Sequence, residues 1–152
     1  MVILVAEDEA LVALVLELAL TAAGHRVLGP VATAAGALRL AEEGRPDLAL
    51  LDVNLAEGGD GAAVARALRD RHGTPCLFLS GQVAQARAAR DAAWGLVRKP
   101  YDPAGVLRAA GGPAAGARAV PRGLAPRGGS LFRHGYAAEQ ATSLARNWYS
   151  RG

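Results

Sequence analysis

The sequence has little of what several common classes of protein require. Its single cysteine, Cys76, excludes an internal disulfide and a cysteine metal cluster, and its place inside an apolar run predicts a small buried side chain. No apolar run approaches the roughly eighteen residues of a membrane span, and no basic region precedes the apolar start of the chain. We therefore expect a cytoplasmic protein with neither a signal peptide nor a membrane segment.

Lysine is as scarce as cysteine, because Lys99 is the one lysine among 17 basic residues. Arginine presents a planar fork suited to bidentate pairing, whereas lysine is a compact point charge often used to contact a phosphoryl group. Lys99 follows the apolar run 96–97 and directly precedes Pro100. A chain that otherwise prefers arginine thus keeps an ammonium group at one place, which indicates a function for it.

Charge divides the chain into two parts. Residues 1–110 carry eleven basic and thirteen acidic side chains, a net charge of −2, whereas residues 111–152 carry six arginines and one glutamate, a net charge of +5. The second part opens with Gly-Gly-Pro and is rich in glycine, proline and arginine, as many disordered segments are. We predict one domain over 1–110 and a basic, low-complexity tail over 111–152, with a short helix near 136–149.

Short apolar runs alternate with helical patterns in the first part. The predicted strands are Val2–Ala6, Arg26–Gly29, Leu48–Leu51, Pro75–Leu79 and Gly95–Arg98. The predicted helices are Ala10–Ala23, Ala34–Glu43, Gly61–Arg71, Ala84–Ala93 and Pro103–Ala110. Several strands are apolar on both faces, as buried parallel strands are, and right-handed crossovers then give an α/β fold with a doubly wound five-stranded parallel sheet.

Polar residues follow four of these strands: Glu7 and Asp8, Asp52, Ser80 and Lys99. Ligands of doubly wound sheets bind beyond the carboxyl ends of the strands, so these side chains are expected to meet there. Three carboxylates gathered at one edge repel each other unless a cation binds, and oxygen ligands favour Mg²⁺. An aspartate can itself accept a phosphoryl group, with the lysine and the serine hydroxyl contacting the phosphoryl oxygens.

Four segments together resemble the receiver domain of two-component response regulators. They read ILVAEDE (3–9), DLALLDVNL (47–55), LSG (79–81) and RKPY (98–101), in the order and spacing of that family. The resemblance covers residues 1 to about 110 and implies the (βα)5 flavodoxin-like receiver fold. The segment 75–81 also resembles an alphaproteobacterial type of receiver, and we expect a single-domain regulator.

The resemblance implies a role for each site residue. Asp52 would be the phosphoacceptor, Asp8 would bind Mg²⁺ directly, Glu7 would bind it through a water, and the backbone carbonyl of Asn54 would complete the protein ligands. Ser80 and Lys99 would take the family's hydroxyl and phosphate-contacting positions, with a cis peptide bond after the lysine. The donor would be a histidine kinase or a phosphotransfer protein, and the chain would be a signalling protein rather than an enzyme.

The chain departs from the common receiver pattern at two places. The loop over 55–61 lacks the usual proline and is one residue longer than the commonest form. Leu96 stands where many receivers have a tyrosine or phenylalanine that rotates on activation.

The first predicted helix carries more apolar residues than one buried stripe needs. If Val12, Val15, Leu16, Ala19 and Ala23 face the sheet, a second stripe of Leu11, Leu14 and Leu18 remains at the surface. Exposed apolar stripes usually mark a binding site. In receivers this helix docks against the helices that bear the phosphohistidine, so we assign the stripe to that partner, with self-association or cover by the tail as alternatives.

Two other functions use some of the same residue types. A haloacid-dehalogenase-type phosphohydrolase also uses an aspartate, a serine, a lysine and Mg²⁺, but its nucleophile lies on the first strand and a second aspartate follows two residues later, where this chain has Asn54. A nucleic-acid-binding regulator could act through the six arginines and the aromatic residues of the tail. No helix-turn-helix pattern is present, so nucleic acid is not the favoured partner.

Overall fold

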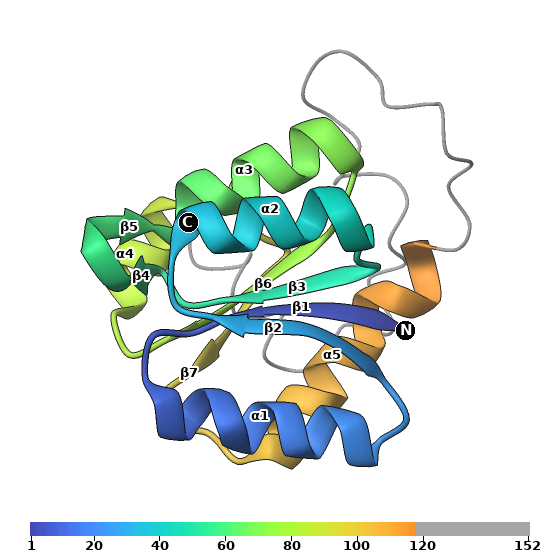
Figure 1. Cartoon of the computed structure of the whole chain (residues 1–152). Coiled ribbons are helices and arrows are strands. Elements are labelled where there is room, and N and C mark those ends of the chain that lie inside the picture. Colours follow the sequence, from blue (N-terminus) through green and yellow to red (C-terminus); the bar gives the residue numbers. More distant parts are fainter. Residues whose placement is uncertain (118–152) are drawn as a thin grey trace.

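The computed structural model describes residues 1–117, with side chains to residue 111. Its core is a five-stranded parallel sheet in the order β2-β1-β3-β6-β7 (Figure 1). The strands are β1 (Val2–Ala6), β2 (Arg26–Val31), β3 (Leu48–Leu51), β6 (Cys76–Ser80) and β7 (Gly95–Arg98). The predicted doubly wound flavodoxin-like fold is confirmed, and each strand lies within two residues of its predicted bounds.

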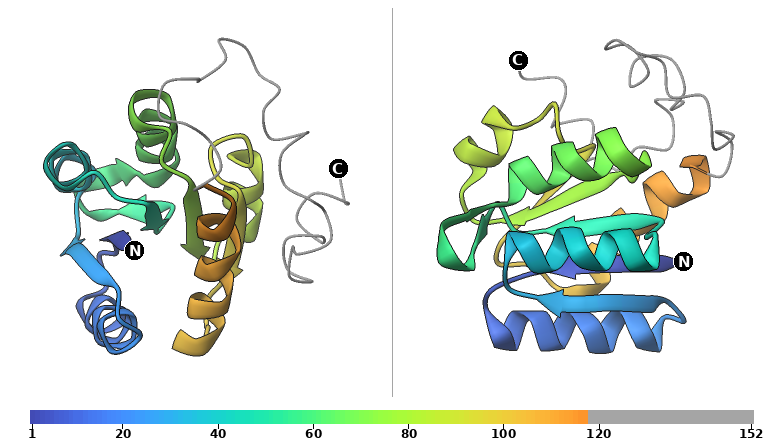
Figure 2. Two further views of the ribbon diagram at one scale, coloured as in Figure 1. Left: turned by 90° about the vertical axis from the view of Figure 1, so that its right-hand side faces the viewer. Right: turned by 45° about the horizontal axis from the view of Figure 1, so that its top comes forward.

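Helices cover both faces of the sheet. α1 (Ala10–Ala22) and α5 (Pro103–Ala117) lie on one face, and α2 (Ala34–Gly44), α3 (Gly61–His72) and α4 (Val83–Ala88) lie on the other (Figures 1 and 2). Each face buries its own apolar cluster, one around Phe78 and Leu51 and the other around Leu50 and Leu79. Successive side chains of each strand point to opposite faces of the sheet and so belong to the two clusters in turn. Both faces are buried, which explains why the strands are apolar throughout.

Side chains and backbone conformation define the helix ends on the α2–α3 face. The Thr33 hydroxyl accepts a hydrogen bond from Gly36 N at 3.1 Å, and Asp60 Oδ1 accepts one from Ala62 N at 2.8 Å. These contacts satisfy amide groups that have no partner inside the first turn of a helix. Gly73, with a φ of 65°, ends α3 in the left-handed conformation that glycine adopts without strain.

Two predicted helix ends are wrong. α4 ends at Ala88 instead of Ala93, because turns after Ala89 bury Ala92 and Ala93 at a spacing that imitates a helical stripe. α5 continues to Ala117 instead of ending at Ala110. A glycine costs a helix only about 1 kcal/mol relative to alanine, and an internal proline can bend a helix without ending it.

The loop after β3 contains structure that the sequence pattern did not predict. β4 (Asn54–Leu55) and β5 (Gly59–Asp60) pair antiparallel around a 3-10 turn at Ala56–Gly58. Ala56 N donates to Ala32 O at 2.9 Å, which ties this hairpin to the loop before α2. The hairpin begins at Asn54, two residues after Asp52.

The predicted tail beyond residue 117, with its helix near 136–149, lies outside the described residues. Within residues 1–117, none of the helices is both long enough and apolar enough to serve as a membrane span.

Candidate functional site

The ends of β1 and β3 place the predicted carboxylates side by side. Glu7 N donates to Val31 O at 2.9 Å, and Asp52 N donates to Ala6 O at 2.9 Å. The parallel ladder therefore continues one step past each strand and holds both residues at the carboxyl edge of the sheet, where the sequence placed them.

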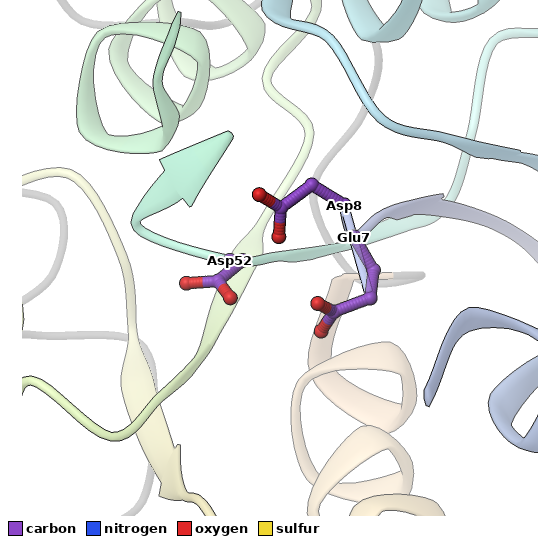
Figure 3. A group of neighbouring side chains, drawn as sticks. All are labelled: Glu7, Asp8 and Asp52. Carbon is purple, nitrogen blue, oxygen red and sulfur yellow. The ribbon is translucent and has the colours of Figure 1, made fainter. Parts of the chain in front are cut away.

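Glu7, Asp8 and Asp52 form a compact acidic cluster (Figure 3). One carboxylate oxygen from each residue lies within 4.8 Å of the others. Glu7 and Asp52 are buried, whereas Asp8 is exposed. An all-oxygen donor set that is open on one side suits Mg²⁺, which keeps several waters and binds through one or two carboxylates.

Lys99 reaches into this cluster from the end of β7. Its Nζ lies 2.7 Å from Asp52 Oδ2, 2.9 Å from Glu7 Oε1 and 3.0 Å from Glu9 Oε1. An ammonium group directs its three donors tetrahedrally and can contact three carboxylates around it, whereas a guanidinium directs its donors within one plane. The lone lysine of the sequence is thus the central cation of the site.

Burial and hydrogen bonding shift the pKa values of Glu7 and Lys99. Burial raises the pKa of Glu7, and the hydrogen bond from Lys99 opposes that shift without cancelling it. Burial lowers the pKa of Lys99, but its hydrogen bonds to Asp52, Glu7 and Glu9 outweigh burial and raise that pKa above the ordinary value. The ammonium group therefore stays charged, while the buried glutamate carries its negative charge at a cost.

Ser80 and Asn54 lie at the same edge of the sheet. Ser80 is buried, its carbonyl accepts a hydrogen bond from Lys99 N at 3.1 Å, and its hydroxyl oxygen accepts one from Gln82 N at 3.1 Å. Asn54 N donates to Asp52 Oδ1 at 3.1 Å, which leaves the side chain of Asn54 free to contact α4. The predicted cis bond between Lys99 and Pro100 is present.

Two polar residues of the site were missed by the sequence interpretation. Glu9 contacts Lys99, and Gln85 Nε2 donates to Asn54 Oδ1 at 3.0 Å, which links α4 to the acceptor loop. The signal for Glu9 was visible, because it is the third acidic residue in a row after β1. Gln85 gave no signal, since a single glutamine on a helix is compatible with any surface position.

The apolar stripe predicted on α1 is exposed. Leu11, Leu14 and Leu18 keep 74%, 49% and 62% of their surface accessible. Val15 and Ala23, which were expected to face the sheet, are exposed as well. That expectation is wrong because α1 packs on the sheet through Ala13, Leu16 and Leu20, a stripe displaced around the helix from the predicted one.

A groove of about 490 Å³ runs between α1 and the segment after β7. Leu11, Val12 and Val15 line one side, and Pro100, Tyr101 and Pro103 line the other. Glu9 and Lys99 also line this groove, so it connects Leu11, the first residue of the apolar stripe, with the charged site.

Comparison with known proteins agrees with this geometry. The profile of the response regulator receiver domain family matches residues 3–110. The phyllosphere-induced regulator PhyR of Methylorubrum extorquens is 34% identical over 106 residues, which are 68% of this chain and 40% of PhyR. The transcriptional regulatory protein AfsQ1 of Streptomyces coelicolor is 40% identical over 80 residues, 53% of this chain and 35% of AfsQ1. The chain thus spans less than half the length of either relative.

A solved structure shares the fold over most of the described residues. The receiver domain of a modulated diguanylate cyclase from Desulfovibrio desulfuricans G20 superposes with a TM-score of 0.70 and 29% sequence identity, covering 77% of this chain and 95% of the other. Receiver domains of two-component systems bind Mg²⁺ at an acidic pocket and interact with histidine kinases or phosphotransfer proteins. The chain belongs to the response regulator receiver domain family.

Proposed function

We propose that this receiver domain accepts a phosphoryl group on Asp52 from a histidine kinase or a phosphotransfer protein, in a reaction that depends on Mg²⁺. The observation that carries the proposal is the place of the Asp52 carboxylate, which lies 2.7 Å from Lys99 Nζ and within 4.8 Å of two further carboxylates. Phosphoryl transfer needs mainly positioning and charge neutralisation, and this arrangement offers both.

In the proposed reaction one Asp52 oxygen attacks the phosphorus atom of a phosphohistidine. The phosphorus–nitrogen bond breaks, its electron pair stays on the imidazole nitrogen, and an acyl phosphate forms on Asp52. Lys99 balances charge on the transferred group, and the Ser80 hydroxyl donates to one of its oxygens. Water later hydrolyses the acyl phosphate and restores the carboxylate, so the chain is modified rather than turning over a separate substrate.

The residues present fit a Mg²⁺ ion. Asp8, Asp52 and the backbone carbonyl of Asn54 would hold it, with Glu7 acting through a water. When bound, the ion supplies positive charge that offsets both the carboxylate repulsion and the charge of the incoming phosphoryl group.

We assign the phosphohistidine partner to the stripe of Leu11, Leu14 and Leu18 on α1, with self-association as the alternative. The stripe is exposed, and its first residue, Leu11, also lines the groove that contains Lys99, so a partner helix lying on the stripe would come close to the acceptor. The alternative of a phosphohydrolase loses support, because Asp52 follows the third strand in sequence, not the first. A function of the tail in nucleic-acid binding concerns residues outside the described range.

Incubation with acetyl phosphate, followed by intact mass measurement, tests the proposal. We expect one added phosphoryl group when Mg²⁺ is present and none when it is chelated. Asp52→Asn should abolish the addition, whereas Asp70→Asn, on the exposed surface of α3, should leave it unchanged. Release of the label by hydroxylamine would identify an acyl phosphate. Equal labelling of the Asp52→Asn variant and the wild type would refute the acceptor assignment.

A further inference from the structure

Glu9 makes a contact that the phosphoacceptor reaction does not need. Its Oε1 lies 3.0 Å from Lys99 Nζ, alongside the contacts of the same ammonium to Glu7 and Asp52. An ammonium group has three N–H donors, so three carboxylate partners use all of them. While Asp52 is still a carboxylate, an incoming phosphoryl group can gain a hydrogen bond from Lys99 only if one of these partners is released.

The three carboxylates differ in how easily they can release the lysine. The Glu7 side chain is fully buried and that of Asp52 is 10% exposed, whereas that of Glu9 is 63% exposed. Water can replace Lys99 as the partner of an exposed carboxylate. A buried carboxylate that loses Lys99 stays desolvated and unpaired, which is strongly unfavourable. Glu9 is therefore the partner that gives way.

The backbone of Glu9 is well placed for such a role. Its N–H donates to Glu7 Oε1 at 3.2 Å, and its carbonyl accepts a hydrogen bond from Ala13 N at 2.9 Å, which begins α1. The main chain is thus fixed at the helix start while the side chain extends into the groove beside the apolar stripe. The carboxylate can move without disturbing the fold.

From this geometry we propose that Glu9 is a positioning residue that restrains Lys99 in the unphosphorylated protein and releases it when a phosphoryl group arrives. The second half of the inference rests on the proposed phosphoacceptor function, whereas the restraint itself concerns the protein before any phosphorylation. Glu9 thereby slows the engagement of Lys99 with an incoming phosphoryl group.

The single lysine allows a direct test of the restraint in the full chain. Acetylation of Lys99 by an amine-reactive ester, without Mg²⁺ or phosphodonor, can be followed by peptide mass mapping, with the N-terminal amine as internal reference. Glu9→Gln should raise the acetylation rate about twofold to fivefold, because an exposed ion pair of ordinary strength is lost. Glu57→Gln, an exposed carboxylate in the loop after Asp52 that is not among the partners of Lys99, should leave the rate unchanged.

The claim that Glu9 slows the engagement of Lys99 with an incoming phosphoryl group is tested by the rate of phosphorylation from acetyl phosphate with Mg²⁺. We expect Glu9→Gln to be phosphorylated faster than Glu57→Gln, although both variants remove one negative charge from the same end of the molecule. If Glu9→Gln does not fold by circular dichroism, Glu9→Ser removes the carboxylate and places a favourable N-cap residue at the start of α1, where the Glu9 side chain makes no capping hydrogen bond.

The outcomes separate the two proposals. Equal acetylation of Lys99 in the Glu9 and Glu57 variants would overturn the restraint, whatever the phosphorylation result. Faster acetylation combined with no phosphorylation of the wild type would support the restraint and contradict the proposed function. Faster acetylation with equal phosphorylation rates of the two variants would refute the claim that Glu9 slows the engagement of Lys99.

Discussion

At the scale of single residues, composition and position identified the centre of the site. Lys99 is the one lysine of the chain, and it lies between Asp52 and two glutamates at the carboxyl edge of the sheet. A sequence can reveal such a residue because the backbone positions are fixed by the strands. It cannot reveal the pairing with Glu9, since the direction of a long exposed side chain depends on its rotamer and its neighbours.

Gly61 shows a second constraint next to the acceptor. A Cβ at this position would overlap the carbonyl oxygen of Asp52, and Gly61 N donates to Val53 O at 2.8 Å. We expect Gly61→Ala to lower the free energy of unfolding by about 1–3 kcal/mol, since backbone must shift to admit the methyl group. Because Asp52 moves with that backbone, phosphorylation from acetyl phosphate should slow as well. Denaturant unfolding and intact mass measure the two effects.

Gly111→Ala is the matched control, because Gly111 lies in α5 with open space around the position of a Cβ. Alanine favours a helix over glycine by about 1 kcal/mol, so this variant should be as stable as the wild type or more stable. If both alanine variants unfold at the same denaturant concentration as the wild type, the close approach at Gly61 does not constrain the acceptor.

At the scale of elements, α1 carries two apolar stripes with different tasks. One packs on the sheet through Leu16 and Leu20, and the other leaves Leu11, Leu14 and Leu18 exposed. Among the described residues this stripe is exposed to solvent, and Leu11 at its start lines the groove that contains Lys99. Both facts favour a partner that binds there while it donates the phosphoryl group.

Leu14→Asp should slow phosphoryl transfer from a phosphohistidine donor by about tenfold or more, the effect of losing roughly 1.4 kcal/mol of binding free energy. Labelling by acetyl phosphate should stay unchanged, because a small donor does not use that surface. Rates from both donors, measured by intact mass, check this expectation. Ala84→Asp, which adds the same charge to the exposed surface of α4, should leave both rates unaltered. Equal loss with both donors would place Leu14 in the folding core instead.

Most of the element pattern could be predicted because it depends on local periodicity. The five strands of the parallel sheet and the first three helices have their predicted places, since apolar runs and helical spacing of apolar residues mark them in the sequence. The β4–β5 hairpin could not be predicted, because two-residue strands depend on contacts such as that of Ala56 with Ala32. The early end of α4 could not be predicted either, because alanines at helical spacing can also be buried by turns.

At the scale of the whole molecule, Cys76 reports on the opening of the fold. It is 2% exposed in the core beneath α3, and burial raises the pKa of its thiol to about 12. A raised thiol pKa keeps the reactive thiolate scarce at neutral and mildly alkaline pH in the folded chain. Labelling of the single cysteine therefore measures how often the molecule opens.

The acidic site makes the stability of the fold against opening depend on Mg²⁺. Glu7, Asp8 and Asp52 gather three carboxylates at one edge of the sheet. An ion that binds there in the folded chain, and does not bind the unfolded chain, must stabilise the fold. At about ten times its dissociation constant, Mg²⁺ should add roughly 1.4 kcal/mol and slow the labelling of Cys76 about tenfold. Asp8→Asn should remove most of this difference between Mg²⁺ and chelator, whereas Asp70→Asn should preserve it. The labelling rates are compared at one pH, so that the thiolate fraction is constant. A Mg²⁺ effect of the same size in the Asp8→Asn variant would show that the ion binds elsewhere on the molecule, and the acidic cluster would then need another explanation.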